Sequence, residues 1–230
     1  MADRVLVIIP AYNERATIAD VVRRAVRYAP VLVVDDCSQD DTGPIAASIP
    51  GCTVIRHPRN THIPEAIRDG FRYALAQGYA YAVTMDAGLS HDPDSLPELI
   101  GMPPTDLVIS YRRERHGVAW YRRALSSAAR HVVDSVLRQG GRPAPYRDVT
   151  SGYRRYSRRA IQEVIEAPMA CRSFDFHFEA LAIVHHAGLG IEEFPIAYTF
   201  TNSSLSWRVV GHALATWWRL ARGLHRRAAP

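Results

Sequence analysis

Apolar positions in the first half of the chain form two alternating patterns. Continuous apolar runs, typical of buried strands, cover residues 4–10, 31–36, 52–56, 79–86 and 106–112. Between these runs, apolar residues spaced by three and four predict amphipathic helices over 16–29 and 65–77. Strands that alternate with helices predict an α/β fold with a mostly parallel central sheet.

The second half of the chain has a more helical pattern. The spacing of apolar residues predicts helices over 118–138, 157–166 and 175–187. Residues 140–156 are rich in turn-forming types and predict a loop. A late strand is expected over 188–200, where Pro195 indicates a sheet edge or a bulge.

The C-terminal segment is a separate amphipathic helix in this interpretation. We expect one domain over 1–204 and this helix over 205–230. Trp217 and Trp218 lie among arginines, a pattern that suits the membrane interface. Packing of the two tryptophans against the domain explains the pattern equally well.

Composition restricts the setting in which the chain works. It is 47% hydrophobic and 22% charged, which favours a folded domain with a sizeable core. No apolar stretch reaches the length of about 18 residues that a transmembrane helix needs, and the N-terminus lacks a signal-peptide cleavage site. Three cysteines without metal-ligand spacing are read as reduced thiols. We therefore expect a cytoplasmic protein, peripheral on the inner face of the membrane if the C-terminal helix binds lipid.

The charge of the chain indicates an anionic partner. The net charge is +5, and arginine supplies all 28 basic residues. Its planar guanidinium suits phosphate, whether on a small molecule or on a membrane surface. Because no nucleic-acid-binding motif is present, nucleic acid is not an expected partner.

Polar and ionisable residues follow four of the predicted strands. In parallel sheets, ligands bind at the carboxyl ends of the strands. The residues at those ends are Pro10–Glu14, Asp35 and Asp36, Asp86–His91, and Tyr111–Arg113. Their expected convergence predicts a ligand site at one edge of the sheet.

Four motifs in order carry a family resemblance. The segments "VIIPAYNE", "VVDDCSQDDT" and "TMDAGLSHDP" resemble those of family 2 glycosyltransferases, which have the GT-A fold. The later "DVTSGYRRY" is similar to the subgroup of dolichyl- and polyprenyl-phosphate mannose synthases. The likeness covers roughly residues 4–200.

The resemblance implies roles for individual residues. Those expected to bind a nucleotide-sugar donor are Pro10, Ala11, Tyr12, Glu14, Asp35, Asp36, Asp86, Ala87 and Gly88. Those expected to act in catalysis are Asp86, Arg112 and Arg154. Those expected to bind the acceptor or its phosphate are Arg122, Arg123, Asp148, Ser151 and Arg154. Arginines would neutralise the leaving diphosphate, and a phosphate acceptor would need no general base.

The chain departs from the family pattern in three places. The usual Asp-x-Asp is Asp86-Ala87-Gly88, followed by Ser90 where a further polar ligand is common. Mg²⁺ and Mn²⁺ prefer carboxylate oxygens, so a divalent cation held by Asp86, with help from Asp92, and a metal-independent site both stay open. His62 stands where a glycine-rich segment is usual, within reach of the donor, and Ser204 replaces a lysine.

Several of these residues also have purely structural explanations. Asn13 and the Asp-Asp-Thr at 40–42 suit helix caps, and His91 suits a structural histidine. The clustered arginines, Arg154, Arg155, Arg158 and Arg159, predict a solvated face, apart from the motif position of Arg154. A surface helix explains His185 and His186.

The leading hypothesis is an inverting glycosyltransferase. It would move a hexose from a nucleotide-diphosphate sugar, GDP-mannose or a UDP-hexose, to a polyprenyl-phosphate acceptor. A soluble small-molecule acceptor such as a nucleoside is the alternative within the same chemistry. A homologue that binds the nucleotide sugar without turnover is the alternative outside it.

Overall fold

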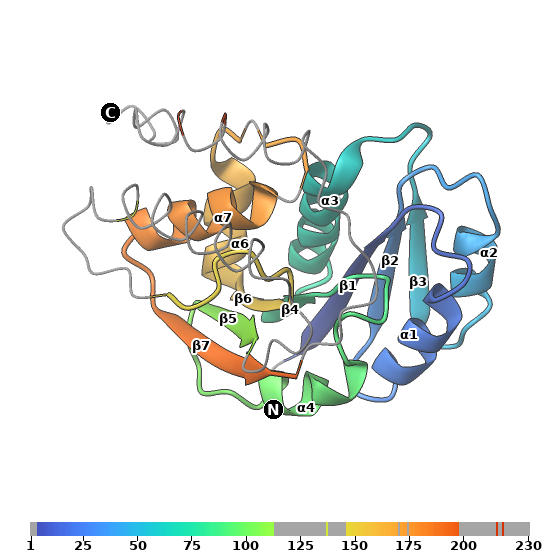
Figure 1. Cartoon of the computed structure of the whole chain (residues 1–230), viewed down its shortest axis with the longest axis horizontal. Coiled ribbons are helices and arrows are strands. Elements are labelled where there is room, and N and C mark those ends of the chain that lie inside the picture. Colours follow the sequence, from blue (N-terminus) through green and yellow to red (C-terminus); the bar gives the residue numbers. More distant parts are fainter. Residues whose placement is uncertain are drawn as a thin grey trace, which may run out of the picture.

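A single mixed sheet is the centre of the computed structural model, which describes residues 4–112, 137, 146–169, 171–173, 175–197, 215 and 218. Within these residues the strand order is β3-β2-β1-β4-β6-β5-β7 (Figure 1). The strands are β1 (Val5–Ala11), β2 (Val31–Asp35), β3 (Cys52–Arg56), β4 (Tyr81–Thr84), β5 (Leu107–Arg112), β6 (Arg154–Ser157) and β7 (Ile191–Ile196). Only β6, among these, runs antiparallel to its neighbours.

Helices cover both faces of the sheet. They are α1 (Ile18–Ala25), α2 (Thr42–Ala47), α3 (His62–Ala76), α4 (Leu96–Ile100), α6 (Arg158–Glu166), α7 (Asp175–His186) and the short 3₁₀ helix η1 (Pro93–Ser95). Leu6 and Ile8 of β1 belong to a core with α3, α6 and α7. Val7 and Ile9 belong to a second core with α1, α2 and α4. The period-two alternation of β1 therefore builds two apolar layers, visible as helices on either side of the sheet in Figure 1.

The expected α/β class with a mostly parallel sheet is confirmed. All five strands predicted in the first half are present, and each fully buried valine or isoleucine in them contributes about 1.5–3 kcal/mol. The late strand is β7, and Pro195 does lie on an edge strand, opposite Tyr111 of β5. An edge strand tolerates proline because one row of its backbone groups has no sheet partner.

Other predicted element boundaries were wrong. The stretch 140–156, expected as a loop, supplies most of β6, whose residues are buried by pairing with β4 and β5. Helix α1 begins at Ile18 with Thr17 as its N-cap, so Asn13 does not cap it. The short helix α4 was not predicted, and α2 was anticipated only by its cap, since Asp41 of the Asp-Asp-Thr segment is its N-cap residue.

Some predictions fall outside the described residues. Of the helix expected over 118–138, only Leu137 is described, and it is helical. The boundary expected between 204 and 205 is not described. In the C-terminal helix, Ala215 and Trp218 are described as helical, and Trp218 is 51% exposed.

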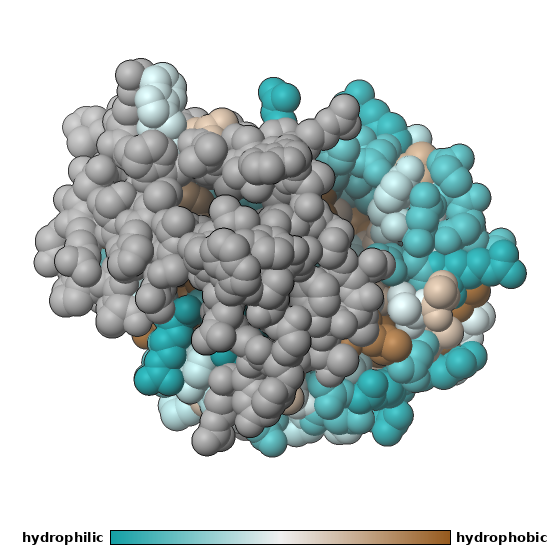
Figure 2. Space-filling model, viewed as in Figure 1, coloured by the Kyte–Doolittle hydropathy of each residue, from teal (hydrophilic) through white to brown (hydrophobic). Residues whose placement is uncertain are grey.

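Arg155 corrects the prediction of a solvated arginine face. Its side chain is buried and donates hydrogen bonds to the carbonyls of Leu99, Ile100, Met102 and Pro103. It thereby satisfies the carbonyls that the end of α4 leaves without helical partners. The described residues visible on the face in Figure 2 are mostly hydrophilic, whereas Arg155 is only 2% exposed.

Candidate active site

The predicted strand ends do meet at one edge of the sheet. Ala11 of β1 is in register with Asp35 of β2, and the amide of Asp36 donates to the carbonyl of Ala11. On the other side of β1, the amide of Met85 donates to the carbonyl of Ile8, which brings Asp86 to the same edge. Tyr12 is 46% exposed here. The loops after β1, β2 and β4 therefore form one rim.

The loop after β1 is held against the loop after β2. Asn13 adopts a positive φ of 56°, and its Oδ1 accepts a hydrogen bond from the amide of Gln39. The amide of Glu14 donates to Thr42 Oγ1 at 2.8 Å. Burial raises the pKa of Glu14, and the charges of Asp86 and Asp40 raise it further. Glu14 is therefore a half-buried carboxyl within the field of Asp86.

The carboxylate oxygens of Asp35 and Asp36 accept hydrogen bonds from other groups of the protein. Asp35 accepts from the amide of Ser38 and from Arg56, both at 2.9 Å. Asp36 accepts from the amides of Thr61 and His62, both at 2.7 Å. Burial alone would raise the pKa of Asp36, but these hydrogen bonds outweigh it and lower that pKa. In the described structure both carboxylates order loops.

The loop after β4 contains Asp86 and Asp92, which make different contacts. Asp86 is partly exposed, Ala87 is buried, and a Cβ added at Gly88 would meet no described atom within 4 Å. Nδ1 of His91 lies 3.5 Å from Asp86 Oδ2 and accepts from the Asp86 amide at 3.4 Å. Asp92 is turned elsewhere, because it pairs with Arg24 of α1 and caps η1. The help expected from Asp92 at a metal is therefore absent in this arrangement.

His91 is a buried residue of this loop. Its ring stacks on Tyr153 with 5.2 Å between centroids. Burial lowers the pKa of His91, the nearby carboxylate of Asp86 opposes that shift, and Arg112 reinforces it. The buried imidazole of His91 therefore supports the backbone of Asp86 from the protein interior.

The segment 148–154 closes the other side of the site. Nε of Arg112 lies 3.3 Å from Asp148 Oδ2, and Ser151 Oγ lies 2.6 Å from Ser110 Oγ. A Cβ on Gly152 would lie 3.2 Å from Asp86 Oδ1 and 2.9 Å from His177 Nε2. Only a residue without a side chain lets this segment come so close to Asp86.

Arg154 is placed differently from the sequence-based expectation. It is fully buried, and its guanidinium donates to the carbonyls of Ser151, His177 and Val149. Those bonds fix the 149–151 segment to α7. The geometry thus favours a positioning role for Arg154, whereas Arg112 remains partly exposed.

His177 is a site residue that the sequence analysis missed. It lies on α7, and nearly every side chain of that helix is buried, so the surface helix expected to explain the histidines was wrong. Burial, Arg154 and His91 together place the pKa of His177 well below its ordinary value. The signal in the sequence was a histidine inside the apolar run "FDFHFEALAIV". Arg122, Arg123 and Ser204 lie outside the described residues.

The side chains that surround Asp86 offer few ligands for a metal ion. Gly88 supplies no side-chain oxygen, and His91 and His177 are buried. Within the described part of the chain, no three His, Cys, Asp or Glu side chains form a cluster that could hold an ion. These residues alone do not provide the oxygen set that a hard cation prefers.

The comparisons with known proteins decide the family. Residues 6–165 match the family described as Glycosyl transferase family 2. The chain belongs to this family. It is therefore a glycosyltransferase, as its motifs predicted.

Curated relatives of this family 2 glycosyltransferase include two enzymes named for lipid-phosphate mannose transfer. The undecaprenyl-phosphate mannosyltransferase of Micrococcus luteus is 33% identical over 95% of either chain. The polyprenol monophosphomannose synthase of Mycolicibacterium smegmatis is 30% identical over 85% of this chain and 77% of its own.

Solved structures confirm the GT-A fold. Glucosyl-3-phosphoglycerate synthase from Mycobacterium tuberculosis, in complex with Mn²⁺, UDP and phosphoglyceric acid, superposes with a TM-score of 0.73. The match covers 95% of this chain and 78% of the other at 20% identity. At that identity the likeness shows the fold alone.

The candidate site of this glycosyltransferase contains few charged side chains and is closely packed. One partly exposed carboxylate, Asp86, lies beside the buried imidazole of His91, and both Asp86 and buried His177 approach the backbone of Gly152. The ion pair of Arg112 and Asp148 lies beyond them. No helix among the described residues combines the length and the apolar character that a bilayer-crossing segment requires.

Proposed function

We propose that the chain transfers a hexose from a nucleotide-diphosphate sugar, GDP-mannose or a UDP-hexose, to a polyprenyl-phosphate acceptor. The names of the relatives from Micrococcus luteus and Mycolicibacterium smegmatis support the lipid acceptor and the mannosyl group. The observation that carries the proposal is the position of Asp86, at the rim of the sheet beside Glu14 and Gly152.

The proposed reaction is a single displacement with inversion. An oxygen of the acceptor phosphate attacks the anomeric carbon as the bond from that carbon to the donor diphosphate breaks. The acceptor oxygen is already anionic, so no side chain has to remove a proton. The protein then has two tasks, which are to align the two substrates and to balance the charge of the leaving diphosphate.

The proposal divides these tasks among named residues. Asp86 orients the donor, and Arg112, held by Asp148 at 3.3 Å, supplies positive charge near the phosphates. Arg154 holds the Ser151–Gly152 segment in place through its three carbonyl contacts. Arg122 and Arg123 remain proposed phosphate ligands from the sequence alone.

Substrate assays test this proposal. Purified chain is incubated with GDP-mannose or UDP-glucose and with a polyprenyl phosphate in detergent, and hexosyl lipid is measured. Parallel reactions contain 3-phosphoglycerate or a nucleoside in place of the lipid. Product on the lipid supports the proposal, and product only on a soluble acceptor replaces it with the second candidate. Donor that binds without any product indicates a non-catalytic homologue.

The role of a divalent cation needs its own assay. The solved structures from Mycobacterium tuberculosis include complexes with Mn²⁺ and with Mg²⁺ beside UDP. A cation shared by Asp86 and the donor diphosphate would make transfer sensitive to EDTA. Transfer that continues in EDTA would show that arginine charge suffices. Gly88→Asp adds the missing carboxylate where there is space for it, and it raises Mn²⁺-dependent activity only in the first case.

Membrane association is proposed through the C-terminal segment 205–230. Tryptophan and arginine side chains suit an interface that holds the acceptor lipid. The chain would then act as a peripheral protein on the cytoplasmic face. Sedimentation with anionic vesicles, for the full chain and for Trp217→Ala/Trp218→Ala, tests this.

A further inference from the structure

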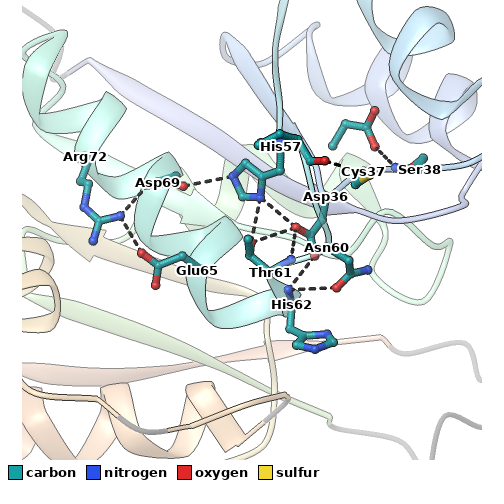
Figure 3. Close-up of polar contacts among 12 residues, drawn as sticks. Asp36, Cys37, Ser38, His57, Asn60, Thr61, His62, Glu65, Asp69 and Arg72 are labelled. Atoms are coloured by element: carbon teal, nitrogen blue, oxygen red, sulfur yellow. Dashed lines mark hydrogen bonds and ion pairs between the residues drawn. The ribbon is translucent and has the colours of Figure 1, made fainter.

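His57 is a buried residue that the proposed reaction does not use. It follows β3 directly, and its ring lies between the end of β2 and helix α3 (Figure 3). Nδ1 lies 2.8 Å from Asp36 Oδ1, and Nε2 lies 3.0 Å from Asp69 Oδ2. The imidazole therefore faces a carboxylate with each of its nitrogens.

The chemistry of this arrangement links three segments of the chain. A carboxylate only accepts, so Nδ1 must carry its hydrogen to bond Asp36 Oδ1, while Nε2 on the other side of the ring lies at ion-pair distance from Asp69 Oδ2. Other charged groups next to the ring are on α3, where Arg72 pairs with Asp69 and with Glu65. His57 thus joins Asp36 of the β2 loop to the Asp69–Arg72 pair of α3.

Hydrogen bonds to Asp36 connect His57 to the start of α3. Its two oxygens accept from the amides of Thr61 and His62, and Thr61 Oγ1 adds a third bond at 2.9 Å. His62 has a positive φ of 66° and its ring points away from the network in Figure 3. The backbone conformation at the first turn of α3 therefore depends on Asp36, whose orientation depends on His57.

We propose that His57 is a positioning residue for donor binding. It fixes Asp36 and the segment 57–62 so that the first turn of α3 is ordered before the donor arrives. Here His62-Ile63-Pro64 forms the first turn of α3, and Asp36 accepts from the amides of Thr61 and His62 at its start. The link to the donor rests on the proposed function, whereas the bridge itself does not.

The test compares His57→Gln with Glu65→Gln. Glu65 lies on the same helix and bonds Arg72, but it does not contact His57, so it is a matched control. In His57→Gln we expect the KM for the nucleotide sugar to rise about tenfold with kcat within about twofold, because ordering the turn is then part of donor binding. Amide exchange at Thr61 and His62 should also quicken about tenfold, since their shared acceptor loses its support. Glu65→Gln should change neither quantity.

Each result has a defined consequence. Unchanged exchange at Thr61 and His62 would overturn the bridge, and faster exchange with an unchanged KM would overturn its role in donor binding. If His57→Gln does not fold, Asp69→Ala removes the carboxylate that faces Nε2 and the same two readouts apply. If the wild-type chain uses no nucleotide sugar, the proposed function has failed and the exchange data alone judge the bridge.

Discussion

Gly152 lies so close to Asp86 and His177 that a side chain there would crowd both residues. A Cβ there would lie 2.9 Å from His177 Nε2 and 3.2 Å from Asp86 Oδ1. We expect Gly152→Ala to lower the free energy of unfolding by about 1–3 kcal/mol through overpacking. It should also lower the transfer rate by about 10²-fold, because Asp86 is displaced. Urea unfolding and initial rates measure both effects.

The control for this prediction is Gly88→Ala. No described atom lies within 4 Å of a Cβ at Gly88, and its φ is not in the left-handed region. Its free energy of unfolding should stay within about 0.5 kcal/mol of the wild type. Equal losses of stability in the two variants would show that the contact between Gly152 and Asp86 is not decisive.

The backbone of His62 is in a strained conformation, and the energetic cost is confined to this residue. Its positive φ of 66° is unfavourable for any residue with a Cβ, and glycine avoids that cost. His62→Gly keeps the amide that donates to Asp36, so the variant should gain about 1 kcal/mol in the free energy of unfolding. His62→Ala keeps the strain and should show no gain. A loss of stability in His62→Gly would mean that the histidine ring makes a stabilising contact.

At the residue scale, the sequence indicated which residue types matter better than it indicated which side chains they contact. The motifs singled out Asp86, Asp148 and Ser151, and in the structure these residues contact His91, Arg112 and Ser110. They did not reveal that both carboxylate oxygens of Asp36 accept hydrogen bonds from the segment 57–62. Those bonds depend on His57 lying within hydrogen-bond distance of Asp36. Such contacts between distant segments exist only once the sheet has formed.

Helix α4 shows how an element depends on a side chain from elsewhere. Arg155 donates to four carbonyls at and beyond its end. Arg155→Met should lower the free energy of unfolding by about 3–5 kcal/mol, because buried carbonyls lose their donors. Arg158→Met is the control, since that exposed side chain makes one long bond to Leu75 and should cost under about 1 kcal/mol. Calorimetry or urea unfolding of both variants checks this, and similar costs would refute it.

Helix α7 and the β4 loop together make stability depend on pH. His91 and His177 are buried with pKa values lowered from 6.5, most strongly for His177. Below pH 6.5 the unfolded chain binds protons that the folded chain does not, so the free energy of unfolding falls as the pH falls. The slope should reach about 1.4 kcal/mol per pH unit for each imidazole. His177→Gln should flatten it, whereas substitution of exposed His62 by Gln should not; equal slopes in all three chains would contradict this.

At the element scale, strands with a continuous apolar sequence were easier to predict than a strand that depends on pairing with its neighbours. Strand β2 is a continuous apolar run that indicates its own burial. Strand β6 has the sequence "RRYS", and it is a strand only because β4 and β5 pair with it. No local pattern in those four residues could have predicted it.

For the whole molecule, the order of the strands creates the site. The parallel strands β1, β2 and β4 bring their carboxyl ends to one rim, and antiparallel β6 brings the segment that precedes it, including Gly152, to that rim as well. The convergence of polar strand ends was therefore predictable from the α/β pattern. The closeness of α7 to Asp86 was not, because it depends on how the second half folds over the sheet.

The central claim is that hexosyl transfer to polyprenyl phosphate depends on the carboxylate of Asp86. The most direct measurement is the initial rate of hexosyl-lipid formation by the wild-type chain, Asp86→Asn and Asp92→Asn. Asp92 is a nearby carboxylate that pairs with Arg24, so it controls for a general change of charge in the loop. We expect Asp86→Asn to lose about 10²-fold or more in rate, and Asp92→Asn to stay within about threefold of the wild type. Wild-type rates in Asp86→Asn, or no hexosyl lipid from any nucleotide hexose, would contradict the claim.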